Sequence, residues 1–171
     1  MNIYINCLVL LVSFFFPAAF ADTKTVNDGL SENMKYVALA HAIYKDGVQK
    51  VPEWAVNQLV VEQSIDLLKS SISSERPDGT DDDSFPSGHT GKAFAPAWFI
   101  YRNYGAKEAA PYFIAASYVG YARVKLDRHR PIDVAASVAL SYVVSRVFTG
   151  SDPTISIDVG DGFRVHMAKA I

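Results

Sequence analysis

Charged side chains are absent from the first 21 residues of this chain and frequent in the remainder. All 16 Lys and Arg residues and all 18 Asp and Glu residues lie between Asp22 and Ile171. A total of 171 residues, half of them apolar, suits a single domain that packs a hydrophobic core. The chain is therefore predicted to consist of an uncharged segment, residues 1–21, and one folded domain, residues 22–171.

The uncharged segment has the pattern of a secretory signal. Cys7 to Phe20 is apolar apart from Ser13, and Ala19 and Ala21 are the small residues of a cleavage site. The run is shorter than the ~20 residues that cross a bilayer, although residues 1–6 lack the Lys or Arg of a typical signal. We predict a cleaved signal peptide and a periplasmic domain, with an uncleaved anchor and association with the inner membrane as open alternatives.

Net charge and cysteine content exclude some functions. The formal net charge is −2 and the pI is about 6.0, so no broad basic surface is available to neutralise a nucleic-acid backbone. Cys7 is the only cysteine and would leave with the signal. The mature domain is therefore predicted to have no disulfide and no nucleic-acid partner, and any anion must be bound locally.

Helical periodicity and terminator residues predict an all-α fold, a compact bundle of about five helices. Residues 22–33 are polar and are expected to be an irregular lead-in before a helix capped by Ser31, and 78–84 is expected to be a loop. His41, on the apolar side of the first helix, is interpreted as a core histidine rather than a catalytic one. The helices are predicted at 31–46, from Pro52 to a point before Pro77, at 87–104 with a bend at Pro96, at 110–124 and at 131–149.

Two further patterns qualify this fold. Residues 109–122 and 134–145 are free of charge but too short for confident membrane spans, so we interpret them as buried core helices, with membrane association as an open alternative because of their aromatic residues. After Gly150 apolar residues alternate with polar ones on both sides of Gly160-Asp161-Gly162. This pattern predicts a small C-terminal β-hairpin whose apolar face packs on the helices.

Two clusters of residues suited to phosphate binding lie between residues 69 and 89. Lys69 and Arg76 are seven residues apart, so a helix running through both would point them the same way, about 10 Å apart. Ser87 and Gly88 open the predicted third helix, where free amides and the helix dipole favour an anion. The next residue, His89, could donate a proton to a leaving oxygen.

A third cluster comprises Arg123, His129 and Asp133. A carboxylate four residues after a histidine, near a helix start, can accept the Nδ1 proton of the ring. That contact would fix the tautomer and leave Nε2 free as a nucleophile. Each cluster is common by itself, but their order and spacing together are specific.

The combination Lys69-x6-Arg76-Pro77, Pro86-Ser87-Gly88-His89 and Arg123-x5-His129-x3-Asp133 resembles the three-part signature of the type 2 phosphatidic acid phosphatase superfamily. This superfamily includes lipid phosphate phosphatases, bacterial non-specific acid phosphatases and vanadium haloperoxidases. The resemblance implies a helical bundle and phosphomonoester hydrolysis without a metal ion or other cofactor. One residue departs from the pattern, since Ala122 stands where the family usually has Ser.

Carried over to this chain, the resemblance implies a role for each motif residue. His129 would attack phosphorus and form a phosphohistidine, Asp133 would orient it, and His89 would protonate the leaving alkoxide. The phosphoryl oxygens would be bound by Lys69, Arg76, Ser87, the amide of Gly88, and Arg123. Catalysis of phosphoryl transfer depends mainly on such charge stabilisation.

Neighbouring charged residues remain open to several interpretations. Asp81-Asp82-Asp83 could be a solvated loop, a rim that positions substrate, or a cation site. Arg128 and Arg130 could meet a phosphate at the pocket mouth or be solvated.

We therefore predict an exported phosphatase acting on the phosphomonoester or pyrophosphate of a membrane lipid. The alternatives are a periplasmic acid phosphatase for soluble monoesters, a vanadium-dependent haloperoxidase and an anionic-lipid-binding module without turnover. The sequence does not indicate the substrate or the oligomeric state.

Overall fold

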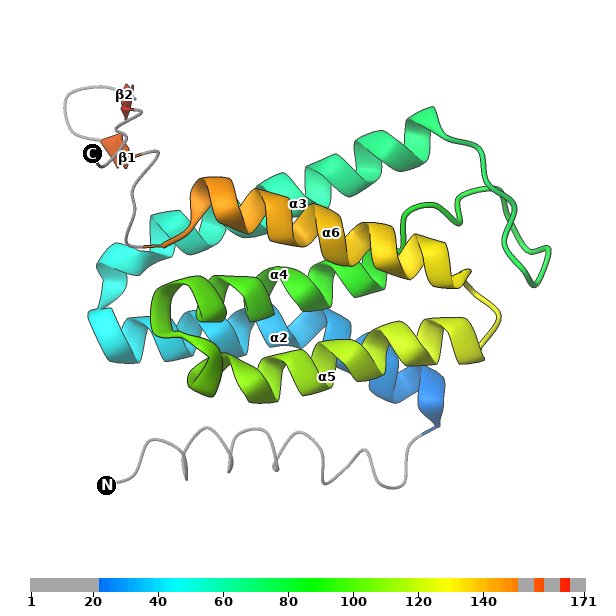
Figure 1. The fold of residues 1–171 in the computed structure, drawn as a ribbon, viewed down its shortest axis with the longest axis horizontal. Helices are drawn as coiled ribbons and strands as arrows, with labels where there is room; N and C mark the ends of the chain where they lie inside the picture. The colour runs from blue at the N-terminus through cyan, green and yellow to red at the C-terminus, as the bar shows by residue number, and fades with distance from the viewer. Residues whose placement is uncertain (1–21, 151–155, 159–163, 167–171) are drawn as a thin grey trace.

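Long helices lie side by side and form the body of the molecule (Figure 1). The computed structural model describes residues 22–150 and two short strands, 156–158 and 164–166. The predicted all-α class is confirmed for residues 22–150. The helices are α2 (Thr23–Asp46), the 3-10 turn η2 (Val48–Lys50), α3 (Val51–Ser71), α4 (Gly88–Tyr104), α5 (Ala106–Lys125) and α6 (Pro131–Phe148).

Helix α2 begins eight residues earlier than expected. Asp22 caps it, because its side chain accepts hydrogen bonds from the amides of Lys24 and Thr25 at 2.8 and 3.0 Å. The prediction of an irregular lead-in at 22–33 was therefore wrong. Ser31, expected to be the cap, is buried inside the helix and donates to the carbonyl of Asp28 at 3.0 Å.

The other helices follow the terminator residues. Pro52 lies in the first turn of α3 and Pro131 in the first turn of α6. Proline is tolerated there because backbone amides in the first turn have no hydrogen-bond acceptor within the helix. Gly105, with φ of 84°, ends α4. α5 is longer than predicted, because it begins directly after this glycine. The helix predicted to extend toward Pro77 ends at Ser71. Arg76 therefore lies in the following loop and does not share a helical face with Lys69.

Helix α4 lies at the centre and packs against α2, α3, α5 and α6. Its small residues, among them Ala93 and Ala97, are fully buried and let the surrounding helices approach closely. Asn57 of α3 ties the centre together, since it donates to the carbonyl of Ala95 at 3.1 Å and accepts from Ser145 at 2.9 Å. His41 is buried against Tyr112 and Glu108, as expected for a structural histidine.

Helix α6 has a polar buried side and an apolar exposed side. Its buried residues include Ser137, Ser141 and Ser145, and Ser137 and Ser141 donate to backbone carbonyls. Its exposed residues include Ile132 (63% exposed) and Val143 (56%). The interpretation of 134–145 as a buried core helix was therefore wrong for one face. α6 is also long and apolar enough to cross a membrane, the one such helix among the described residues.

The strands β1 (Ser156–Asp158) and β2 (Arg164–His166) pair antiparallel, with Ile157 opposite Val165. They lie where the alternating pattern predicts a hairpin. The side chains of these strands and the predicted turn lie outside the described residues, so the packing of the hairpin on the helices stays a prediction. Residues 1–21, the predicted signal peptide, also lie outside the described part of the chain.

Candidate active site

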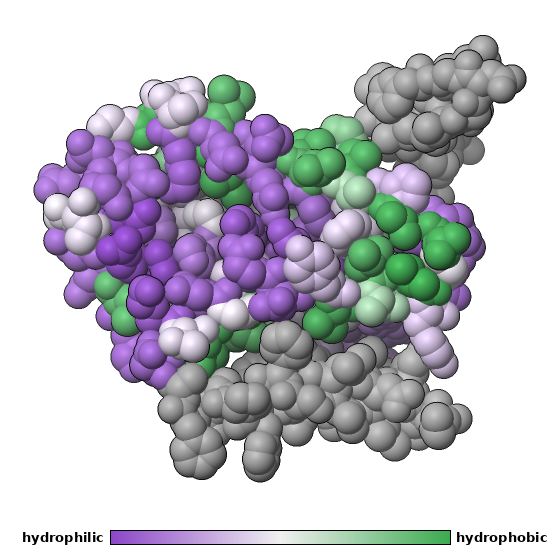
Figure 2. Space-filling model, turned by 180° about the vertical axis from the view of Figure 1, so that it is seen from behind, coloured by the Kyte–Doolittle hydropathy of each residue, from purple (hydrophilic) through white to green (hydrophobic). Residues whose placement is uncertain are grey.

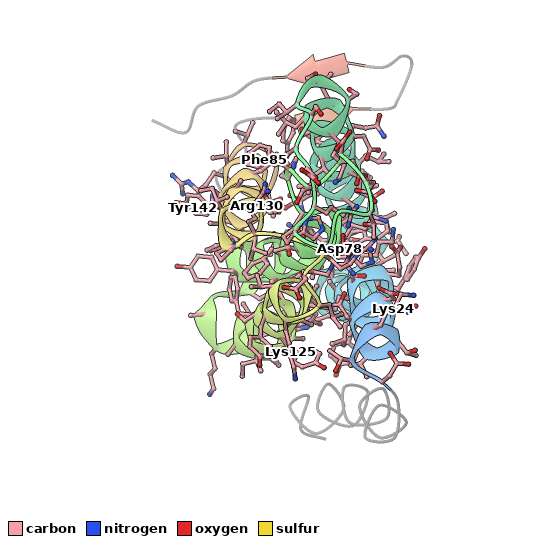
Figure 3. All side chains as sticks on the ribbon, turned by 90° about the vertical axis from the view of Figure 1, so that its right-hand side faces the viewer. Lys24, Asp78, Phe85, Lys125, Arg130 and Tyr142 are labelled. Atoms are coloured by element: carbon pink, nitrogen blue, oxygen red, sulfur yellow. The ribbon has the colours of Figure 1, made fainter. Side chains whose placement is uncertain are left out.

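A pocket of about 400 Å³ opens at the end of the bundle where α4 and α6 begin and α5 ends, the end that faces the viewer in Figure 3. Asp78, Phe85 and Arg130 are labelled there around the loop that crosses this end. In Figure 2, which shows the molecule from behind, this end of the bundle is at the left, and hydrophilic residues gather there. The pocket is lined by Lys69, Arg76, Gly88, His89, Arg123 and His129, together with Glu62, Ile65, Asp66, Asp83, Lys92 and Arg128.

The three sequence clusters therefore meet in one pocket. Two of the predicted site residues, Ser87 and Asp133, do not line it and are buried.

The turn between α5 and α6 holds His129 in place. The amides of Arg128 and His129 donate to the carbonyl of Arg123 at 3.0 and 3.2 Å, which closes the end of α5. Asp127 in this turn has a φ of 53°, a conformation that Asp adopts more readily than most residues. His129 is 2% exposed, so its ring is fixed at the base of the pocket.

Hydrogen bonding defines the tautomer of His129. Its Nδ1 lies 2.7 Å from the carbonyl oxygen of Ser84, and a carbonyl only accepts, so Nδ1 carries the ring proton. Burial of the ring, with Arg123, Arg76 and Lys69 nearby, lowers the pKa of His129 to about 3. At neutral pH the ring is therefore uncharged, and its Nε2 holds a free lone pair.

Asp133 does not make the direct contact that the spacing predicted. Its Oδ2 is 3.8 Å from Nδ1 of His129, beyond hydrogen-bond distance. That oxygen instead accepts from the hydroxyl of Ser84 at 2.6 Å and from the amide of Arg130 at 2.8 Å. Asp133 thus caps α6 and holds Ser84, and the carbonyl of Ser84 holds the histidine.

Five Lys and Arg side chains in the described part of the chain line the pocket, and two of the three that were predicted to bind phosphate have unused donors. Lys69, Arg76 and Arg123 come from α3, the following loop and α5. Among the described residues, Nη1 of Arg76 and Nε of Arg123 are buried without a hydrogen-bond partner. A buried N–H without an acceptor is costly, and an anion in the pocket would supply one.

The acidic loop contacts these cations. Arg76 donates to the carboxylate of Asp83 at 2.5 and 3.0 Å and also to Asp81. Lys69 lies 3.6 Å from Asp83 and donates to its backbone carbonyl. These contacts and nearby hydrogen bonds lower the pKa of Asp83 to about 2, against the opposing effect of its burial. Asp83 therefore lines the pocket, and Asp81 pairs with Arg76 beside it, although both carboxylates are partly exposed.

The start of α4 supplies the backbone part of the site. Ser87 is its N-cap and is fully buried; its Oγ lies 2.9 Å from Oγ1 of Thr90, so the predicted phosphate-binding hydroxyl is engaged within the protein. Gly88 and His89 line the pocket in the first turn. Burial first, and then the charge of Arg123, lower the pKa of His89.

The arginines beside His129 differ in position. Arg128 lines the pocket and pairs with Asp78 at 2.9 Å, whereas Arg130 is exposed and reaches Ser74 of the loop.

Sequence reasoning missed Ser84 and also Asp28, whose Oδ1 is 3.0 Å from Nε2 of His89. No local sequence signal marks either contact, because each joins residues that are far apart in the sequence.

A family model described as the PAP2 superfamily matches residues 36–155, which include all three clusters. The chain belongs to the PAP2 superfamily. The match lies within the predicted domain and agrees with the resemblance seen in the sequence.

Two curated relatives of this PAP2 chain are named as lipid A phosphatases. The chain is 35% identical over 82 residues to the lipid A 1-phosphatase of Porphyromonas gingivalis, which covers 46% of this chain and 18% of that protein. It is 31% identical over 108 residues to the lipid A 4'-phosphatase of Helicobacter pylori, which covers 57% of this chain and 54% of that protein. The matched region thus spans about half or less of each relative. No solved structure matches the chain significantly.

Proposed function

We propose that the protein is a periplasmic phosphatase that removes a phosphate group from a membrane lipid through a phosphohistidine on His129. The observation that carries this proposal is an uncharged, buried His129 with Nε2 free, at the base of a pocket lined by Lys69, Arg76 and Arg123. A neutral imidazole is a nucleophile, and three cations stabilise the charge of a phosphoryl group in transit.

In the proposed reaction Nε2 of His129 attacks phosphorus and the bond from phosphorus to the ester oxygen breaks. Lys69, Arg76 and Arg123 bind the phosphoryl oxygens, and His89 gives its proton to the leaving alkoxide. Water then attacks the phosphohistidine, returns one proton to His89 and releases inorganic phosphate. These protein groups supply the nucleophile, acid and charges, so the proposal requires no metal ion.

Two observations support a lipid as the substrate. The named activities of both relatives concern lipid A, a membrane lipid. The exposed side of α6 is largely apolar, and exposed Ile132 lies in the first turn of this helix, next to the pocket. A lipid headgroup could therefore reach the pocket while α6 lies against the bilayer.

The test is phosphate release by the full chain from lipid A, phosphatidate and a polyprenyl pyrophosphate, compared with 4-nitrophenyl phosphate and glucose 6-phosphate, with a chelator present. We expect a higher kcat/KM for at least one lipid than for either soluble ester. We also expect His129→Ala to abolish release from every substrate. Lys125→Ala is the control, since Lys125 is an exposed basic residue two positions after Arg123.

Other outcomes would redirect the assignment. A preference for soluble esters would favour an acid phosphatase, and halide oxidation that appears only with vanadate would favour a haloperoxidase. Phosphate binding without turnover on the whole panel would favour a lipid-binding module. Full activity of His129→Ala would overturn the mechanism.

A further inference from the structure

Helix α2 places a carboxylate against the predicted acid of the reaction. Oδ1 of Asp28 is 3.0 Å from Nε2 of His89, although 61 residues separate them in sequence. The same oxygen lies 3.7 Å from Nη1 of Arg123. Asp28 therefore lies between His89, the proposed proton donor, and Arg123, a proposed phosphate-binding residue.

The two oxygens of Asp28 face different surroundings. Oδ1 is shielded from solvent and makes an ion-pair contact with His89, but no hydrogen bond of regular geometry, among the described residues; the side chain as a whole is 39% exposed. Oδ2 lies 3.6 Å from Lys24 on the outer side of α2, where Figure 3 labels that lysine. One oxygen thus belongs to the site and the other to the surface.

Four charged groups face His89 from the elements packed around it. Asp28 and Glu32 lie on α2, Lys92 on α4 and Arg123 on α5. Glu32 pairs with Lys92 at 2.7 Å. Asp28 is therefore the carboxylate in contact with the ring, opposite the positive charge of Arg123.

We propose that Asp28 is a positioning residue for His89: its carboxylate contacts the Nε2 side of the ring, favours the charged ring against the surrounding cations, and directs Nδ1 toward the leaving oxygen. This inference rests on the proposed function.

In the first half-reaction the bond from phosphorus to the ester oxygen breaks and the Nδ1 proton passes to that oxygen. The ring becomes neutral and keeps its Nε2 proton, which still faces Asp28. In the second half-reaction the attacking water returns a proton to Nδ1.

The electrostatics agree with this geometry. Burial and the neighbouring cations Arg123 and Lys92 lower the pKa of His89, whereas the nearby carboxylate of Asp28 opposes this shift. Without Asp28 the charged ring would survive only at lower pH. The acid form would then be scarcer at the pH where His129 reacts.

The test compares two phosphate esters that differ in their need for a proton. Octyl phosphate leaves as a strongly basic alkoxide, and 2,4-dinitrophenyl phosphate leaves as a stable phenolate. We expect Asp28→Ala to lower kcat for octyl phosphate about tenfold or more and for the dinitrophenyl ester less than about twofold, because only the first needs general acid catalysis. Asp28→Asn keeps an acceptor and should recover part of the octyl phosphate rate.

The pH profile separates charge from shape. With octyl phosphate, the fall of kcat at alkaline pH should move to lower pH in both variants at position 28. Glu32→Gln is the matched control, since it removes another α2 carboxylate that pairs with Lys92 and not with the ring. It should leave the ratio of the two rates unchanged.

Equal loss of both rates in Asp28→Ala, or no loss of either, would overturn the role of Asp28 while the proposed function stands. Absence of turnover by the wild type, or full activity of His129→Ala, would overturn the proposed function and this inference with it.

Discussion

The two ring nitrogens of His129 are in different surroundings, and this difference defines the residue's chemistry. Nδ1 donates to the carbonyl of Ser84, which leaves Nε2 unprotonated in the pocket. Asp133 acts on the histidine only through Ser84, because its Oδ2 accepts the Ser84 hydroxyl at 2.6 Å. Ser84 is therefore the link between the capped start of α6 and the nucleophile.

Replacement of Ser84 by Ala removes the hydroxyl and keeps the carbonyl. We expect the free energy of unfolding to fall by about 1 kcal/mol, because the buried carboxylate of Asp133 loses one of its two donors and keeps the amide of Arg130. We also expect kcat to fall with little change in KM. The orientation of the His129 ring becomes less restricted, whereas the basic side chains that bind the phosphate are unchanged. Denaturant unfolding and steady-state kinetics measure both.

Ser70→Ala is the control for that experiment, because Ser70 is exposed and bonds only within α3. An unchanged kcat in Ser84→Ala would mean that Asp133 does not act through Ser84.

Stability should depend on pH through His129. Its pKa is about 3 in the folded protein and about 6.5 in an unfolded chain, so between these values the unfolded state binds a proton that the native state does not. The contribution of His129 is complete above about pH 6.5 and is lost as pH falls toward 3.

Thermal unfolding from about pH 7 to about pH 4 tests this linkage. The Tm of His129→Gln should fall less steeply with acid than that of the wild type, which carries the added cost of protonating the histidine. Parallel curves for the two proteins would show that His129 has no lowered pKa.

At the scale of the elements, α6 combines a role in the site with a role at the surface. Its buried serines bond to the backbone of neighbouring segments, while Ile132 and Val143 are exposed. This polarity is the reverse of a helix on the surface of a protein surrounded by water. It agrees with the proposal that this face lies against lipid.

The charged substitution Val143→Asp should weaken binding to anionic phospholipid vesicles, measured by co-sedimentation, because burying a carboxylate in lipid is costly. Leu59→Asp is a matched control, since Leu59 on α3 is 57% exposed and Val143 is 56% exposed. If Val143→Asp and Leu59→Asp bound the vesicles equally well, α6 would not be the face that contacts the membrane.

Most element boundaries followed from local signals. Pro52, Gly105 and Pro131 each act within their own turn, so the helices they bound were predictable from the sequence. The first turns of α2 were missed because the polar pattern of 22–33 was given more weight than the Asp22 cap.

The exposed face of α6 was missed for a different reason. A charge-free segment usually fills a core, and here serines occupy the buried side.

The site was predictable where its residues act through type and spacing. Lys69, Arg76, His89, Arg123 and His129 all line the pocket. The contacts to Ser84 and Asp28 were not predictable, because they join segments 45 and 61 residues apart. Such partners depend on how the helices pack and not on any local pattern.

For the whole molecule, a chain with a net charge of −2 concentrates cations in one pocket. Carboxylates of the acidic loop partly neutralise them, and Nη1 of Arg76 and Nε of Arg123 lack a partner within the described residues. A bound anion would complete these contacts and stabilise the folded state by mass action.

Inorganic phosphate should therefore raise the Tm, by an amount equivalent to about 2.7 kcal/mol at a hundred times its Kd. The shift should be lost in Arg123→Ala and kept in Lys125→Ala, with chloride of the same ionic strength as the reference. An equal shift in both variants would place the anion elsewhere.

The central claim is that His129 becomes phosphorylated during turnover. Rapid acid-free quenching of the full chain with a ³²P-labelled lipid phosphate, followed by peptide mapping, tests it most directly. The account predicts label on the peptide containing His129, stable in alkali and labile in acid, and no label in His129→Ala. Turnover with no label on His129, or label on another residue, would contradict it.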